Sequence, residues 1–130
     1  MLIFGHRFIS SQSFYHIEDI DAIVHTPSNS LIYLVFSEKN LDTINHLKDN
    51  DINFALAVNT VRDLIYAENM GASFVVVESV LAKSAQKIAE TYLFDAKVLC
   101  RIREESQIEA MAFEGIDGVV FSDAIIKITS

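Results

Sequence analysis

Residues 59–79 read NTVRDLIYAENMGASFVVVES and contain one complete helix followed by one complete strand. Thr60 and Asp63 have the spacing of a capping box, in which the hydroxyl of the first residue accepts a hydrogen bond from a helix N–H. The apolar residues that follow recur at helical spacing on one side. Gly71 stands where the end of a helix favours a positive φ. The run FVVV at 74–77 is typical of a strand that is covered on both faces.

The same unit recurs along most of the chain. Apolar, β-branched runs begin about every 20–24 residues, and each run is followed by a polar turn and a helical pattern. Strands joined by single helices run parallel, with right-handed crossovers. We therefore predict an α/β fold of repeated βα units that form a mainly parallel sheet, with strands at 31–36, 54–58, 74–77, 98–102 and 119–121.

The N-terminal part does not follow this repeat. Residues 2–9 alternate loosely and predict a short strand, whereas residues 14–24 fit a helix and a strand equally well. Pro27, the only proline, forbids a helix before it and marks the end of this segment. We predict one domain over residues 1–130, with an N-terminal strand and irregular segment at 1–27 and the βα repeats at 28–130.

Five repeated strands fit two architectures. One is an open, doubly wound, flavodoxin-like sheet with helices on both faces. The other is about half of a (β/α)8 barrel, which would need a partner to close or cover it. We predict the open sheet, with the half-barrel as the alternative.

One stretch near the C-terminus bears on this choice. The sequence GIDGVVFSDAI at 115–125 resembles the last strand of phosphate-binding (β/α)8 barrels such as the tryptophan synthase alpha chain, and GASFVV at 71–76 looks like an earlier strand entry of aldolase-type barrels. The resemblance implies a phosphate site built on a Gly-Ser pair at a short helix N-terminus. Here Ser122 and Asp123 occupy those positions, and a carboxylate about 4 Å from a phosphate charge costs about 4 kcal/mol. We therefore expect that phosphate site to be lost.

The amino-acid composition limits the kinds of partner that we expect for this protein. Hydrophobic residues make up 51% of the chain, which favours a doubly covered sheet together with a homo-oligomer that buries further apolar surface. The net charge of −8 would repel phosphate backbones and anionic lipids, so we expect no nucleic acid and no membrane partner. The apolar run 31–36 is too short to span a bilayer, and Gly5 and His6 interrupt any signal-peptide core. A single cysteine, Cys100, excludes an internal disulfide and indicates the cytoplasm.

Ligands of α/β proteins bind beyond the carboxyl ends of the strands. The pocket interpretation makes Glu78 a base and lets Arg101 hold an anion. The structural interpretation treats the same positions as helix caps, with Arg101 paired to Glu78 across neighbouring strands. The candidate ligand-binding residues at these ends are Ser37, Asn59, Glu78, Ser79, Arg101, Arg103, Ser122 and Asp123.

Other chemistry has little support in the sequence. Asp21 and His25 stand four residues apart without a third ligand at a diagnostic distance, so we expect no metal site. Cys100 is predicted to be a buried small hydrophobe. No phosphate loop, catalytic motif or dinucleotide fingerprint occurs, and we expect no cofactor. The prediction is a small cytoplasmic protein that acts by binding or self-assembly without catalysis. The alternative is an enzyme or sensor that binds a small polar or anionic metabolite at the strand ends.

Overall fold

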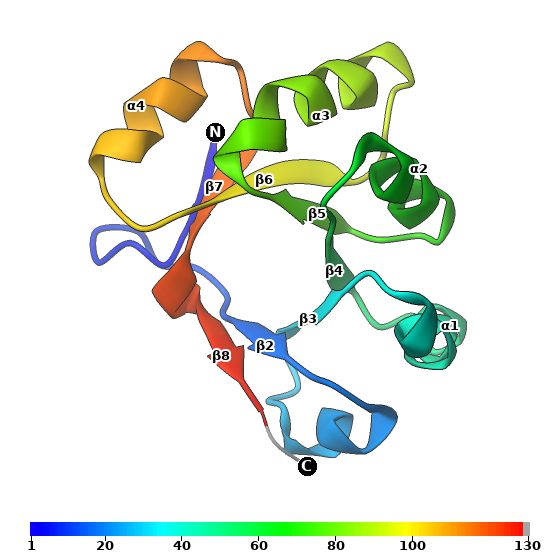
Figure 1. The fold of residues 1–130 in the computed structure, drawn as a ribbon. Coiled ribbons are helices and arrows are strands. Elements are labelled where there is room, and N and C mark those ends of the chain that lie inside the picture. Colours follow the sequence, from blue (N-terminus) through cyan, green and yellow to red (C-terminus); the bar gives the residue numbers. More distant parts are fainter. Residues whose placement is uncertain (129–130) are drawn as a thin grey trace.

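The structure, a computed structural model, describes residues 1–128 and has eight strands there in a single parallel sheet (Figure 1). The order across the sheet is β1-β7-β6-β5-β4-β3-β2-β8, so β2 to β7 lie side by side in chain order. The strands are β1 (Leu2–Phe4), β2 (Phe14–His16), β3 (Leu31–Val35), β4 (Phe54–Ala57), β5 (Phe74–Val77), β6 (Lys97–Ile102), β7 (Gly118–Phe121) and β8 (Ile125–Lys127).

Four α-helices connect the strands from β3 to β7 and lie outside the curled sheet (Figure 1). They are α1 (Leu41–Asp49), α2 (Val61–Asn69), α3 (Ser79–Thr91) and α4 (Ser106–Phe113). The predicted α/β class with parallel βα repeats is confirmed. A sequential strand order with helices on one side is the arrangement of the half-barrel alternative, since a doubly wound sheet reverses its strand order and carries helices on both faces.

The local signals of the repeat have the expected geometry. Thr60 Oγ1 accepts a hydrogen bond from the N–H of Asp63 at 3.1 Å and so caps α2. Gly71 follows α2 with a φ of 88°, a conformation that glycine adopts without strain. These two positions fix where α2 begins and where the chain turns into β5.

Side chains of alternate strand residues point to opposite faces of the sheet, so the core consists of two separate clusters. The outward-facing side chains pack against the helices and include Ile32, Leu56, Val75 and Cys100. The inward-facing side chains form a second cluster on the concave side, built from Phe4, Phe14, Leu31, Tyr33, Ala55, Val76, Leu99, Val120 and Ala124. Both faces of the sheet are therefore buried, as the uniformly apolar strand sequences predict.

The sheet is open at its edges but strongly curled. Strand β7 pairs with β6 and β1 near one edge, whereas β8 is the strand at the other edge. Only the 3₁₀ turn η3 (Ser122–Ala124) separates β7 from β8 in the chain. So short a connection can reach both ends of the strand order only if the sheet bends back on itself.

The N-terminal segment contributes two of the strands. The strand predicted at 2–9 is limited to β1, which pairs with β7. The ambiguous residues 14–24 form β2 and then the 3₁₀ helix η1 (Ile20–His25), and β2 inserts between β3 and β8. The segment before Pro27 is thus part of the same sheet as the repeats.

A buried polar cluster ties α3 to the start of β6 and β7. Gln86 is only 4% exposed and donates a hydrogen bond to a carboxylate oxygen of Asp117 at 3.1 Å. The other carboxylate oxygen accepts from the N–H of Val98 at 2.9 Å, and the N–H of Asp117 donates to Gln86 Oε1. This cluster fixes the level at which β6 enters the sheet.

Within residues 1–128, no helix combines the length and the apolar character that crossing a bilayer requires.

Candidate functional site

A cavity of about 190 Å³ lies at the carboxyl ends of β3 to β6, on the concave side of the sheet. We call it the mouth cavity. It is lined by Tyr33, Val35, Ala57, Val58, Asn59, Val76, Glu78 and Arg101. Three of the predicted ligand-binding residues, Asn59, Glu78 and Arg101, therefore meet in one place.

Two long polar side chains meet across this cavity. Tyr33 lies on β3 and Arg101 on β6, and both side chains line the cavity, close enough for the Arg101 cation to act on the pKa of the Tyr33 hydroxyl. On a flat sheet these strands would be about 14 Å apart, because adjacent strands are separated by about 4.8 Å. Curling of the sheet, together with the small inward-facing residues Ala55 and Ala57 on β4 between them, brings the two groups together.

Arg101 is held on one side and lacks an acidic partner. Its Nε donates to Ser122 Oγ at 3.1 Å, which orients the planar guanidinium. Among the ion pairs of residues 1–128, none joins Arg101 to a carboxylate within 4.0 Å, and Glu78 lines the same cavity without contacting it that closely. The pairing of Arg101 with Glu78 that the structural interpretation offered is therefore not formed.

The hydroxyl of Tyr33 is kept in its neutral form. Tyr33 is only 3% exposed, and burial raises its pKa above the usual value near 10. The nearby Arg101 cation opposes this shift and the Glu78 carboxylate adds to it. At neutral pH, Tyr33 is thus an uncharged donor and acceptor beside a cation.

The other predicted residues lie apart from the mouth cavity. Ser37 caps the 3₁₀ turn η2 (Glu38–Asn40) by accepting a hydrogen bond from the N–H of Lys39. Ser79 is the first residue of α3, and Arg103 is exposed after β6 with its N–H donating to Gln107 Oε1. Ser122 contacts the cavity only through Arg101, and Asp123 is exposed in η3. The helix-cap interpretation thus holds for Ser37.

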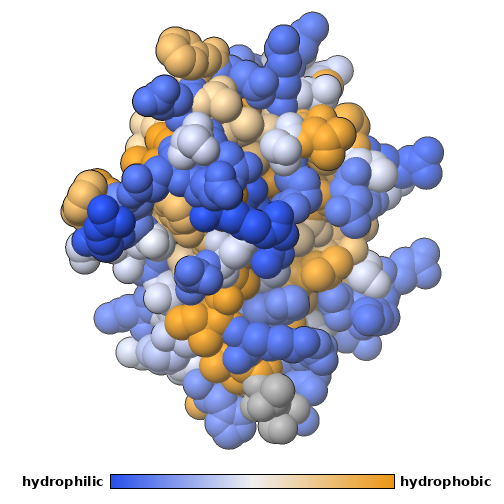
Figure 2. All heavy atoms as spheres, turned by 60° about the vertical axis from the view of Figure 1, so that its left-hand side comes forward, coloured by the Kyte–Doolittle hydropathy of each residue, from blue (hydrophilic) through white to orange (hydrophobic). Residues whose placement is uncertain are grey.

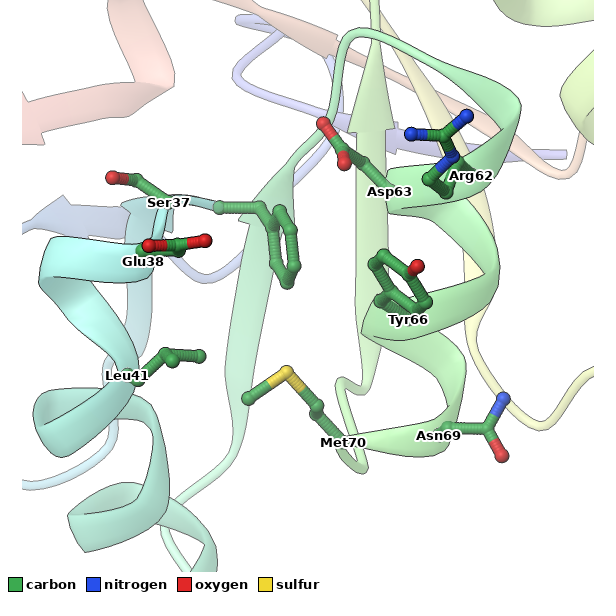
Figure 3. A pocket seen from close by; sticks show the side chains of 9 residues that line it. Ser37, Glu38, Leu41, Arg62, Asp63, Tyr66, Asn69 and Met70 are labelled. Carbon is green, nitrogen blue, oxygen red and sulfur yellow. The ribbon is translucent and has the colours of Figure 1, made fainter.

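A larger hollow of about 650 Å³ lies between α1 and α2, outside the sheet (Figure 3). Its floor is apolar, with Leu41 on one side and Tyr66 and Met70 on the other (Figure 3). Glu38 and Asp63 stand at one end of it. Arg62 also lines the hollow, but two carboxylates outnumber this one cation, whereas the mouth cavity has one cation and one carboxylate, so the hollow offers an anion less than the mouth cavity does.

The remaining reactive side chains do not assemble a second centre. No group of three or more His, Cys, Asp or Glu side chains that could hold a metal ion occurs in residues 1–128. Cys100 faces the helices and is fully buried, as predicted, and this burial raises its thiol pKa to about 11. His6 forms a hydrogen bond with Glu105 on the convex side, and that bond lowers the carboxyl pKa of Glu105.

The sequence-based prediction missed Tyr33 and His16. A tyrosine inside the apolar run 31–36 is a usable signal, because a buried phenol requires a hydrogen-bond partner. His16 fell in the segment that fitted both helix and strand, and its ring packs edge-on against the Tyr33 ring with 5.0 Å between centroids.

No family model matches the chain, and no curated protein is similar to it in sequence. The mouth cavity must be interpreted from its own geometry.

Proposed function

We propose that this protein binds a small organic anion in the mouth cavity, through Arg101. The observation that carries this proposal is a half-buried arginine without an acidic partner, facing a cavity at the carboxyl ends of parallel strands. A guanidinium forms two parallel hydrogen bonds with a carboxylate, and such charge-assisted bonds are stronger than neutral ones. The hydrogen bond to Ser122 orients the guanidinium before a ligand arrives, and Tyr33 lies beside it in the same cavity.

The other lining groups favour a ligand that carries more than an acid group. Glu78 and Asn59 supply a carboxylate and an amide at the outer part of the cavity. A carboxylate accepts hydrogen bonds from a hydroxyl or an ammonium group and repels a second anion placed against it. The ligand we propose therefore has an acid group toward Arg101 and a donor group toward Glu78.

A calorimetric titration with acetate, lactate and succinate tests this function. Arg101→Met should weaken binding roughly ten-fold or more, because a charge-assisted hydrogen bond is worth about 1.5–3 kcal/mol. Arg62→Met removes the same charge from α2, away from the mouth cavity, and should leave the affinity unchanged. Equal affinities for wild type and Arg101→Met would refute the proposal.

Self-association is the second candidate function. Leu93 and Phe113 are 85% and 90% exposed, and both follow or end a helix on the same side of the sheet. On the face shown in Figure 2, hydrophobic residues also gather in a band among hydrophilic ones in the lower part of the view. A homo-oligomer would bury such surface, and it would lose stability when Leu93 and Phe113 are both replaced by serine. A solution mass equal to one chain at micromolar concentration contradicts this candidate.

We also place the working protein in the cytoplasm, where a single cysteine stays reduced and no disulfide is needed for stability.

A further inference from the structure

A second cavity adjoins the mouth cavity at the same edge of the sheet. It has a volume of about 330 Å³, and Val35 at the end of β3 lines both cavities. The walls also touch, because the ring of His16 in the second cavity packs against Tyr33 in the first. Burial lowers the pKa of His16, and the Arg101 cation adds a smaller contribution in the same direction, so its electrostatic field reaches His16 as well. The two cavities are therefore parts of one concave surface.

The volumes of the two cavities favour a ligand that occupies both of them. Ligand pockets in proteins usually measure about 300–1,000 Å³, and the mouth cavity alone is smaller than that. The combined volume of the mouth cavity and the second cavity falls within this usual range. Val35, which is 40% exposed between them, offers an apolar contact to the middle of a ligand.

The second cavity contains its own cation. Lys39 lines it, and in the part of the chain that the structure describes no carboxylate lies within 4.0 Å of the Lys39 ammonium. Glu18 lines the same cavity, but it is already paired with Lys127 at 3.1 Å. Each of the two cavities thus holds one cation without an acidic partner.

We propose that the ligand has two acidic groups, one bound by Arg101 and the other by Lys39, joined by a short apolar chain that crosses Val35. Linear dicarboxylates are the simplest probes of the two acidic groups, although they lack the donor group that we propose to face Glu78. This inference rests on the proposed anion binding at Arg101 and adds the second acidic group to it. Asn40 supports the arrangement, since its side chain donates to the Val35 carbonyl at 2.6 Å and holds the ridge between the cavities in position.

The test is a calorimetric titration with linear dicarboxylates from malonate to adipate and with monocarboxylates of the same lengths. For wild type, one chain length should bind roughly five-fold or more tightly as the dicarboxylate than as the monocarboxylate. Lys39→Met should remove this preference, and its exposed position makes it tolerant of the change. Lys87→Met, which removes the same charge from the exposed side of α3, should keep the preference.

The outcomes separate this inference from the proposed function. A dicarboxylate preference that is absent, or that survives Lys39→Met, overturns the second acidic group while binding at Arg101 stands. Monocarboxylate binding that is unchanged in Arg101→Met overturns the proposed function itself. Absence of binding of every dicarboxylate up to about 10 mM overturns both.

Discussion

Removal of the Asp117 carboxylate should cost this fold a large part of its stability. In Asp117→Ala the Val98 N–H loses its acceptor, and the Gln86 side-chain amide keeps only the longer hydrogen bond to Glu90 at 3.4 Å; Val98 and Gln86 are both buried. A buried donor left without a partner costs about 1–3 kcal/mol, so the loss at Val98 together with the weakened bonding of Gln86 predicts a loss of about 2–3 kcal/mol. Domains of this size have a total free energy of unfolding of about 5–15 kcal/mol. Asp117→Asn keeps one acceptor oxygen and should lose about half as much.

Urea unfolding followed by circular dichroism measures both changes in the free energy of unfolding. Asp123→Ala is the matched control, because Asp123 is exposed in η3 and its removal should change stability by less than about 0.5 kcal/mol. If Asp117→Ala lost no more stability than Asp123→Ala, the polar cluster would not be what holds α3 to the sheet. An equal loss of stability for Asp117→Asn and Asp117→Ala would show that the acceptor oxygen kept in Asp117→Asn does not contribute, which contradicts this explanation.

Three further predictions concern packing, reactivity and pH. Gly118→Ala should destabilise the fold by about 1–3 kcal/mol in urea unfolding, since a Cβ there would lie 2.7 Å from Leu99 Cδ2 and 2.8 Å from the Leu2 carbonyl oxygen; an unchanged midpoint would refute this. Cys100, with a thiol pKa of about 11, should react with iodoacetamide at pH 8 only as fast as the chain unfolds, and a native rate equal to that in urea would contradict its burial. Burial, aided by Lys127, lowers the pKa of His16 below 6.5 in the folded state, so its contribution to stability is present above pH 6.5 and declines as the pH falls below that value. In urea unfolding at pH 7.5 and 5.5, His16→Gln should therefore lose less stability than wild type on acidification, and an equal or larger loss would argue against it.

The local features of the fold follow from local sequence. Thr60 and Gly71 determine where α2 begins and where the chain leaves it, because a hydroxyl cap and a positive φ depend on few neighbours. The uniform strands predicted a sheet covered on both faces. Pairings between distant segments, such as that of β1 with β7, have no such signal, since Leu2 and Gly118 meet only after the whole sheet has formed.

The candidate site was predictable only in part. Residues after parallel strands share one edge of a sheet, which is why Asn59, Glu78 and Arg101 were expected together and do line one cavity. The closeness of Arg101 to Tyr33 depends on how strongly the sheet curls, and curvature is a property of the assembled strands. A flat sheet would have left the same residues too far apart to hold one small ligand.

The most direct test of the anion site is the ¹⁵Nε–Hε signal of Arg101, followed by NMR during a titration with succinate. If the guanidinium binds the ligand, this signal should shift and saturate with the same midpoint as the heat of binding. If succinate binds and the Arg101 signal does not shift, Arg101 is not the anion-binding group. If succinate does not bind at all, the proposed anion site is also contradicted.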